Sequence, residues 1–462
     1  MSHPAKRQKT VVSVYPQSQS YVQQSLERAF SHVREEFLFS ATSGSSGSTS
    51  STAATPKQAD VEWSDYDEID WDSLRPNKLV NSYVIRKGLI RKNHLAHTVA
   101  LYLSKNPKSG LARAVPRTYF FNLSFPDELD ELLMDDLYEV AQSFEANDND
   151  DRGEGDRKTW WILKAALADK GNGIRLFSSR DTLEAIFEEF DIDSDDDDDD
   201  EAQDEADNEQ NGYGDHTRVD ATQMREWEYV AAPLLVDPSS SDNEGRKFHL
   251  RVYVVAAGGL RVHIHRPFLA LFAPVAYEAP TETEDGRIDL ASHLTNTCLQ
   301  TSINGSSEHT KADLAVSAWP NLVGKAILSG PRKGDKLNEG DVKSVEDQVA
   351  DSVSEVFKAA VGAGTSFQTL PNAFEIFGCD FLVDESMQVS LLEVNACPDF
   401  GQTGVELQNV IDHLFKETVD KVVVPFFGSD DAVAGGLSKL TMDNGGRDGL
   451  RQVLDMQVSR AW

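Results

Sequence analysis

The segment that most limits what this chain can fold into is residues 374–404, FEIFGCDFLVDESMQVSLLEVNACPDFGQTG. Apolar and β-branched runs lie on both sides of a polar turn at residues 384–387, and this pattern predicts a β-hairpin. Successive side chains of a strand point to opposite faces of a sheet, so the first strand has an apolar face and Asp380 on the other. The apolar face carries Phe377, Cys379, Phe381 and Val383.

The second strand should send Leu392 and Val394 to the core and leave Glu393 and Asn395 on the face of Asp380. Two carboxylates this close raise each other's pKa unless a cation joins them. Mg²⁺ prefers oxygen ligands and takes one or two carboxylates, with phosphates and water completing its shell. The three polar residues therefore indicate a magnesium site, although a hairpin with a solvent-facing polar edge also fits them when they are taken alone.

The expected register of this hairpin follows from its turn. If Val383 pairs with Gln388, Asp380 falls opposite Leu391 and lies on the same side as the other two polar residues. The two carboxylates and the amide then meet at one end of the strands.

Composition narrows the class of protein. A length of 462 residues predicts two or three domains, and a net charge of −33 argues against nucleic-acid or anionic-membrane partners. Cys298, Cys379 and Cys397 lie far apart without metal-ligand spacing, which is typical of a reduced intracellular protein with buried thiols. No apolar run reaches the roughly 20 residues of a membrane span, and the N-terminus lacks the apolar core of a signal peptide. We therefore expect a cytoplasmic protein with no membrane partner.

Changes in composition divide the chain into four segments. Residues 1–58 are expected to be a disordered tail that ends in a Ser/Thr/Gly linker. Residues 59–150 predict a small α/β domain, and residues 151–428 a larger one. The larger domain contains an acidic, disordered insertion at residues 191–218, and residues 429–462 should be a loose tail.

Cationic groups precede the hairpin on several predicted strands. Lys164 emerges at the end of the buried strand WWILK, and Lys170 lies beside Gly171 and Gly173 in a loop. A glycine loop that carries a lysine can fold over polyphosphate, although a simple turn also fits the KGNG sequence. The Walker and dinucleotide-binding glycine patterns are both absent from the sequence.

The strand RKFHLRVYVV places Lys247, His249 and Arg251 on one face. Such a face favours a phosphate or carboxylate, and the alternative is a solvent-facing strand. GGLRVHIHRPFLALF should pair as the next strand and bring Arg266 near. The histidine spacings match no structural zinc site.

Taken in order, these motifs resemble those of the ATP-grasp ligases and, within them, the tubulin-tyrosine ligase family. The resemblance rests on WILKAALADKGNGI, PLLVDP followed by RKFHLRVYVV, HLTNTCLQ, and the hairpin with its D…ExN pattern. It covers roughly residues 79–427 apart from the acidic insertion. It implies an α/β (α+β) ATP-grasp fold, in which a small N-terminal α/β domain precedes two lobes that clasp ATP.

The resemblance also implies roles for single residues. Those matching catalytic positions, at the transferred phosphate and the acceptor carboxylate, are Lys92, Arg251 and Arg266. Those matching nucleotide-binding positions are Lys164, Lys170, Gly171, Gly173, Glu228, Tyr229, Val230, Lys247 and His249. Those matching magnesium ligands are Asp380, Glu393 and Asn395.

Two positions differ from the family pattern. The family's KFDIR strand has an aspartate where this chain has His249, and its adenine hinge QKY is Trp227-Glu228-Tyr229 here. The first difference removes an anionic group from the site, and the second replaces a lysine by a carboxylate.

The function that the resemblance implies is an ATP- and Mg²⁺-dependent ligase that works through an acyl phosphate. Its expected partners are a free amino acid, tyrosine by analogy, and a protein acceptor, possibly the tubulin tail. Two alternatives share the motifs: an ATP-grasp enzyme that joins small carboxylates and amines, and a catalytically inactive interaction protein.

Overall fold

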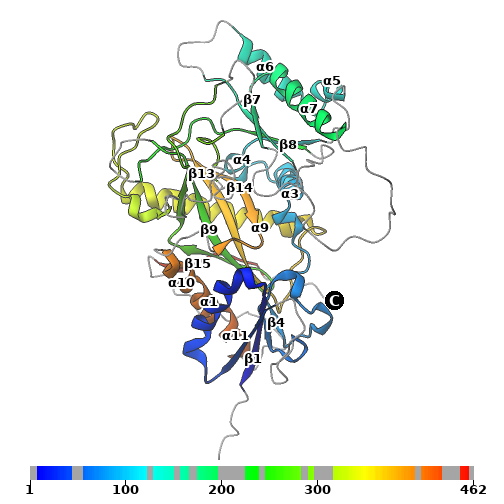
Figure 1. Ribbon diagram of the computed structural model, residues 1–462, viewed down its shortest axis with the longest axis vertical. Helices are drawn as coiled ribbons and strands as arrows, with labels where there is room; N and C mark the ends of the chain where they lie inside the picture. The colour runs from blue at the N-terminus through cyan, green and yellow to red at the C-terminus, as the bar shows by residue number, and fades with distance from the viewer. Residues whose placement is uncertain are drawn as a thin grey trace, which may run out of the picture.

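A computed structural model describes the chain over most of its length. The described residues are 8–43, 56–121, 128–149, 157–165, 174–195, 224–238, 245–281, 290–295, 316–400, 407–428 and 448–456. Within these ranges the strands form three sheets, which follow one another along the long axis of the molecule (Figure 1).

The N-terminal sheet is parallel and has the strand order β2-β1-β3-β4. Its strands are β1 (Lys9–Tyr15), β2 (Phe37–Ser43), β3 (Val61–Glu62) and β4 (Leu79–Val80). Helix α1 (Ser20–Phe30) connects β1 to β2 and buries Val22, Leu26 and Phe30. The expectation of a tail over residues 1–58 is therefore wrong for residues 9–43, because this strand-helix-strand unit has an apolar side that packs into a core.

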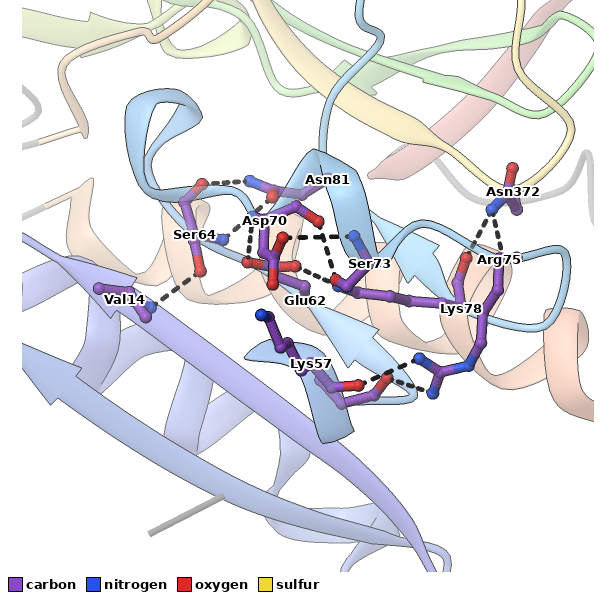
Figure 2. A network of polar contacts seen from close by, with 11 residues as sticks. Val14, Lys57, Glu62, Ser64, Asp70, Ser73, Arg75, Lys78, Asn81 and Asn372 are labelled. Carbon is purple, nitrogen blue, oxygen red and sulfur yellow. Dashed lines mark hydrogen bonds and ion pairs between the residues drawn. The ribbon is translucent and has the colours of Figure 1, made fainter. Parts of the chain in front are cut away.

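A buried polar network holds the N-terminal sheet to the central one (Figure 2). Glu62 and Lys78 are both 0% exposed, and Lys78 Nζ lies 2.5 Å from Glu62 Oε2. The backbone N–H of Asp70 donates to Glu62 Oε1 over 3.0 Å. Asn372, just before the central hairpin, donates from Nδ2 to the carbonyl oxygens of Arg75 (3.0 Å) and Lys78 (2.7 Å). The network thus fixes the loop between β3 and β4 on the central sheet.

The central sheet is organised around β9 (Phe248–Ala257), all of which is buried. β13 (Phe374–Val383) pairs with one edge of β9, and β10 (Arg261–Arg266) and β11 (Leu269–Phe272) pair in succession with the other. The remaining strands are β14 (Val389–Asn395) beside β13, β12 (Val316–Ala318) beside β11, and β15 (Gly449–Asp455) beside β10. The segment expected as a loose C-terminal tail therefore contributes β15, which buries Leu450 and Leu454.

Helices cover both faces of the central sheet. Helix α9 (Glu339–Ala363) packs on the face that carries Val252 and Val254. It begins with a capping box, in which the Asn338 side chain accepts from the N–H groups of Gly340 and Asp341. The other face packs against α1 and against α10 (Gln408–Thr418), a π-helical turn η11 (Val419–Val423) and α11 (Val424–Gly428).

The third sheet lies at the other end of the molecule and has the order β5-β8-β6-β7 (Figure 1). Its strands are β5 (Thr118–Phe121), β8 (Met224–Glu228), β6 (Trp161–Ala165) and β7 (Arg175–Phe177). The helices of this lobe are α5 (Leu129–Met134), α6 (Tyr138–Asp148) and α7 (Arg180–Asp195). Phe121, Leu133 and Val140 share one core with Trp161 and Phe177. The expected boundary at residue 150 therefore falls inside a single lobe.

Helices α2 (Lys87–Ile90), α3 (Lys92–Lys105) and α4 (Leu111–Ala114) connect the N-terminal sheet to the third sheet. Short 3-10 turns lie at Gln17–Gln19, Ser31–Val33, Pro56–Gln58, Tyr66–Glu68, Trp71–Ser73 and Trp319–Leu322. Because α7 continues to Asp195, the first residues of the predicted acidic insertion are helical; from residue 196 the insertion lies outside the described ranges.

Two further expectations concern thiols and membranes. Cys379 is buried as expected, Cys397 is exposed, and Cys298 lies outside the described residues. In the part of the chain that the structure describes, no helix has both the length and the apolar character needed to cross a bilayer.

Candidate active site

The predicted hairpin is present as β13 and β14, but its register differs from the expected one. Val383 pairs with Val389 and not with Gln388, and Asp380 lies opposite Glu393 and not opposite Leu391. The physical reason is a β-bulge between Asp380 and Phe381, which inserts one extra residue into β14. The bulge brings the two carboxylates face to face across the strands.

The same bulge changes which side chains face the core. Leu391 is buried with the α9 core, whereas Leu392, expected there, lines a cavity on the other side of the hairpin. An extra residue on one strand interrupts the alternation of side chains. Leu392 and Glu393 therefore both face the cavity, while Val394 returns to the core.

Asp380 forms a buried ion pair with Arg251, its register partner on β9. Arg251 donates from Nε to Oδ1 over 2.5 Å and from Nη2 to Oδ2 over 3.0 Å. The neighbouring Gly378 makes room, because a Cβ there would lie 3.3 Å from Arg251 Cδ. Burial raises the pKa of Asp380 to about 6, against the opposing effect of Arg251 and with a further increase from Glu393.

Glu393 stands at the junction of three elements. Asn395 Nδ2 donates to Glu393 Oε1 over 3.2 Å and to Asp380 Oδ2 over 3.4 Å, while Lys92 at the start of α3 places Nζ 4.0 Å from Glu393 Oε2. Burial alone would raise the pKa of Glu393, but the positive charges of Lys92 and Lys164 outweigh it and lower the pKa to about 2. The carboxylate is therefore ionised at neutral pH.

Lys247 lies on the same side of the sheet as Arg251 and is buried. Its Nζ donates to Tyr229 Oη over 2.8 Å, and Tyr229 Oη lies 2.9 Å from His293 Nδ1. Burial and the nearby charge of Lys164 lower the pKa of Lys247 to about 7. An anion that entered here would restore the full positive charge of the ammonium group.

His249 lies between these two cations and is 2% exposed. Its Nδ1 is 2.6 Å from Thr295 Oγ1, and its Nε2 is 3.8 Å from Asp380 Oδ1. Burial and the positive charge of Arg251 lower the pKa of His249 to about 3, so the ring is neutral at physiological pH.

These groups line one cavity between the third sheet and the central sheet. Its apolar walls are Ile162, Ile174, Val230, Leu294, Leu382 and Leu392. Its polar part contains Lys164, Lys247, His249, Asp380 and Glu393. A cavity lined by both apolar and charged side chains suits a ligand that combines an apolar group with an anion.

The structure brings together most of the residues that the sequence indicated. Lys164, Tyr229, Val230, Lys247, His249, Asp380 and Glu393 line the cavity, and Arg251, Asn395 and Lys92 contact its two carboxylates. Lys170, Gly171 and Gly173 lie outside the described residues, and for Glu228 only the backbone is described, paired with Trp161.

Arg266 does not join the cluster, which corrects the expectation that the next strand brings it near. Its Nη1 lies 3.9 Å from Glu346 Oε2 on α9. The register of β10 sends Val262 and Ile264 to the core under α9, and Arg266 shares their side of the strand. Arg251 points to the opposite side of the sheet.

Sequence reasoning assigned no role to His293 and Thr295. Both line the cavity, where they contact Tyr229 and His249 respectively. Both residues belong to the HLTN motif, which the sequence analysis singled out. The motif alone does not show which strand its side chains face.

The donor set fits one divalent cation in combination with phosphate. Among the residues that the structure describes, no three His, Cys, Asp or Glu side chains form a metal cluster. Mg²⁺ needs only one or two carboxylates when substrate phosphates and water supply the rest. Glu393 is ionised, and Asp380 Oδ1 has a second lone pair beyond its bond from Arg251.

Known proteins with similar sequences belong to one family. Residues 75–431 match the model of the tubulin-tyrosine ligase family. A probable tubulin-tyrosine ligase of Schizosaccharomyces pombe is 38% identical over 400 residues, which is 83% of this chain and 87% of that protein. The probable tubulin-tyrosine ligase PBY1 of Saccharomyces cerevisiae is also 38% identical, over 80% of this chain but only 46% of its own length. This chain thus spans about half of that relative.

Among solved structures, the C-terminal domain of Kluyveromyces lactis Pby1 is similar over nearly the whole chain. The TM-score is 0.63 and the identity 29%, with 97% of this chain and 99% of that chain covered. That protein is described as an ATP-grasp enzyme interacting with the mRNA decapping enzyme Dcp2. The predicted ATP-grasp fold, with mixed α/β structure, is confirmed by this similarity.

Proposed function

Because the chain belongs to the tubulin-tyrosine ligase family, we propose that this ATP-grasp enzyme joins a free amino acid to a protein carboxylate, with ATP and Mg²⁺. The observation that carries the proposal is the convergence of Asp380 and Glu393 with lysines from separate elements at one cavity. Such a set of opposite charges is what a polyphosphate and its cation require.

The cavity would take ATP with the adenine between its apolar walls. The backbone at Tyr229 and Val230 borders this part, and the N–H of Tyr229 already donates to the carbonyl of Trp160 over 2.8 Å. Lys164 and Lys247 would then lie beside the phosphates. The Lys247 ammonium, partly discharged by burial, would be fully protonated in contact with these anions.

Asp380, Glu393 and Asn395 are the residues that would hold Mg²⁺, and the ion would neutralise charge on the phosphate oxygens. The other residues keep this set in place. Lys92 and Lys164 keep Glu393 ionised, and Arg251 orients Asp380 through two hydrogen bonds.

The reaction would proceed in two displacements. An oxygen of the acceptor carboxylate attacks the γ-phosphorus of ATP, and the bond to the bridging oxygen breaks, so that an acyl phosphate and ADP form. The amine of the amino acid then attacks the acyl carbon, expels inorganic phosphate and loses a proton. Arg251 has five N–H donors, of which Asp380 takes two, so the guanidinium can still donate to the acceptor carboxylate. The protein forms no covalent bond to the substrate.

The names of the relatives support a choice of acceptor and amino acid. Two probable tubulin-tyrosine ligases support the tubulin tail and tyrosine, and human tubulin polyglutamylase TTLL6, 29% identical over 41% of this chain, raises glutamate as the alternative. The test is incubation of the full chain with ATP, Mg²⁺, detyrosinated tubulin and each amino acid in turn, with mass spectrometry of the tubulin tails.

We expect the tail to gain the mass of one tyrosine residue, and Glu393→Gln to abolish this gain. If the tail gains glutamate instead, the proposed amino acid is wrong, but the proposed ligase reaction is supported. If the chain neither binds ATP nor forms ADP with any acceptor, the proposed ligase activity is wrong.

A second function, compatible with the first, is interaction with an mRNA-decapping enzyme. It is supported by the Kluyveromyces lactis Pby1 domain, which covers 97% of this chain and is described as interacting with Dcp2. The test is calorimetry of the full chain against the Dcp2 orthologue. Binding that is unchanged by Glu393→Gln would place the partner away from the cavity, and absence of binding would refute this function.

A further inference from the structure

His249 has a geometry that its role in nucleotide binding does not explain. It projects from β9 toward the two carboxylates, between Lys247 and Arg251. Thr295 Oγ1, 2.6 Å from Nδ1, holds one edge of the ring. The opposite ring nitrogen, Nε2, is therefore aimed at the metal-binding residues.

Nε2 is buried and has no hydrogen-bond partner among the described residues. Asp380 Oδ1 lies 3.8 Å away, which is too far for a hydrogen bond. An unsatisfied buried polar atom is costly, so a ligand is expected there. Two donors that each bind one ion at about 2.1 Å lie roughly 3.0 Å apart when adjacent and about 4.2 Å apart when opposite. The observed spacing of 3.8 Å is within about 1 Å of either arrangement, so a small shift of the side chains would let both atoms bind one ion.

The charges around the two carboxylates also favour a nitrogen ligand at this site. Both oxygens of Asp380 accept hydrogen bonds from Arg251, and Lys92 lies 4.0 Å from Glu393. The carboxylates therefore offer less net negative charge than two unpaired ones would. Mg²⁺ depends on such hard oxygen donors, whereas first-row transition ions also bind imidazole nitrogen strongly.

We propose that His249 Nε2 is a direct ligand of the metal ion that accompanies ATP, and that this nitrogen makes the site prefer Mn²⁺ to Mg²⁺. The inference rests on the proposed function, because it concerns the ion bound with the nucleotide. It assigns to His249 a role in metal selectivity.

The first experiment observes the ligand directly. The full chain is loaded with Mn²⁺ and a non-hydrolysable ATP analogue and studied by pulsed electron paramagnetic resonance. Protein labelled with ¹⁵N at histidine separates protein nitrogen from the nitrogens of adenine. We expect coupling from one directly bound histidine nitrogen in the wild type and in His32→Asn, a control distant from the cavity, and none in His249→Asp.

The second experiment measures selectivity. Calorimetry gives the ratio of the dissociation constants for Mg²⁺ and Mn²⁺ in the presence of the analogue. His249→Asp replaces nitrogen by a carboxylate oxygen, so we expect it to shift this ratio at least tenfold toward Mg²⁺, while His32→Asn leaves it unchanged. The unfolding temperature of each variant shows whether it is folded. If His249→Asp fails to fold, the resonance spectrum of the wild type still tests whether a histidine nitrogen binds the metal.

The outcomes separate this inference from the proposed function. If metal and nucleotide bind without a histidine nitrogen in the metal shell, as when Nε2–H donates to a phosphate, the inference is overturned and the ligase proposal stands. An unchanged Mg²⁺/Mn²⁺ ratio in a folded His249→Asp variant also overturns it. If the wild type binds no nucleotide with either ion, both fail.

Discussion

At the scale of single residues, the site depends on charges that come from distant parts of the chain. The ionisation of Glu393 is maintained by Lys92 from α3 and Lys164 from β6, and Asp380 is held by Arg251 from β9. The carboxylates of the site and the cations that balance them thus come from different helices and strands. The charged state of the cavity therefore depends on how these elements are placed relative to one another.

Replacing Glu393 by Gln removes one charge from the proposed metal site at nearly constant side-chain size. We expect turnover of ATP to fall by about 100-fold or more, as for loss of one electrostatic contact to a transition state. The unfolding temperature should change by no more than about 2 °C, since the amide still fits its surroundings. Glu385→Gln in the hairpin turn is the matched control and should stay active. Full activity of Glu393→Gln would show that the metal assignment is wrong.

The lowered pKa of Lys247 leads us to expect that ATP binding depends on pH. Its pKa is lowered to about 7, so at pH 8 the amine is mostly neutral, and phosphates beside it would raise that pKa again. Binding at pH 8 should therefore take up protons, and affinity should fall as the pH rises above about 7.

Calorimetry in buffers of different ionisation enthalpy measures this uptake. Lys247→Met is the control, because it keeps an apolar stem and cannot titrate, and its proton uptake should be smaller. Proton release by the wild type, or equal uptake in the two proteins, would contradict the assignment.

At the scale of elements, β9 shows how one strand serves both stability and function. Its even-numbered residues, such as Leu250 and Val252, pack under α9. On the other face, Lys247 and His249 line the cavity, and Arg251 pairs with Asp380. Nearby positions on that same face, Tyr253 and Val255, pack under α10. The side chains of β9 that face the candidate site are thus limited to the N-terminal half of the strand.

β15 supports the outer edge of the central sheet, which gives a prediction at this scale. Leu454 is 8% exposed and packs into the core under α9. Leu454→Ala should lower the free energy of unfolding by about 2–5 kcal/mol, as for other buried leucines. Asp455→Ala, at an exposed position of the same strand, should change it by less than about 0.5 kcal/mol. Urea unfolding of both variants tests whether β15 belongs to the folded unit; equal effects would contradict it.

The sequence predicted elements better than their boundaries. The alternation in residues 374–395 indicated both strands of the hairpin and the convergence of Asp380, Glu393 and Asn395, because burial on one face enforces a period of two. It did not reveal the bulge, since an extra residue leaves composition unchanged. Arg266 was misplaced for a related reason: β10 does follow β9, but its register, set by pairing with β9 and β15, decides which face each side chain takes.

Segments that pack far from their sequence neighbours were the hardest to predict. Residues 9–43 were expected to belong to a tail, yet α1 packs against α10 nearly 400 positions later. A short amphipathic unit acquires its core only through such long-range contacts. β15 was likewise hard to predict, because it pairs with β10, which lies far away in the sequence.

At the scale of the whole molecule, one apolar core joins the N-terminal unit to the central sheet. Phe30 of α1 is 1% exposed and lies edge-on to Trp63, which in turn contacts Phe374 at the start of β13. The N-terminal residues therefore share one core with the start of the hairpin of the candidate active site.

Phe30→Ala should cost about 3–5 kcal/mol of unfolding free energy, which is typical of a buried aromatic side chain. It should lower the midpoint of a single transition seen both by tryptophan fluorescence and by loss of ATP binding. Leu38→Ala, at a side chain that is 57% exposed, is the control and should leave the midpoint unchanged. Two separate transitions in the Phe30 variant would show that the N-terminal unit unfolds independently.

The net charge of −33 also has a consequence for the proposed substrate. An acidic tail is repelled at long range, and salt screens this repulsion with a Debye length of about 8 Å at physiological ionic strength. Stopped-flow association with an acidic tail peptide should therefore become faster as salt rises from about 20 to 150 mM. Slower association at higher salt would mean that local cations, such as those at the cavity, dominate the encounter.

The position of β15 has a further consequence, for synthesis on the ribosome. β10 leaves the ribosome roughly 180 residues before the strand that covers its outer edge, a delay of about 10–35 s at usual elongation rates. During this interval the nascent chain exposes an unpaired strand edge, and such edges pair readily with other chains. Chaperones that bind nascent chains would therefore act on this protein before β15 is made, and a premature stop before Gly449 would make the exposure permanent.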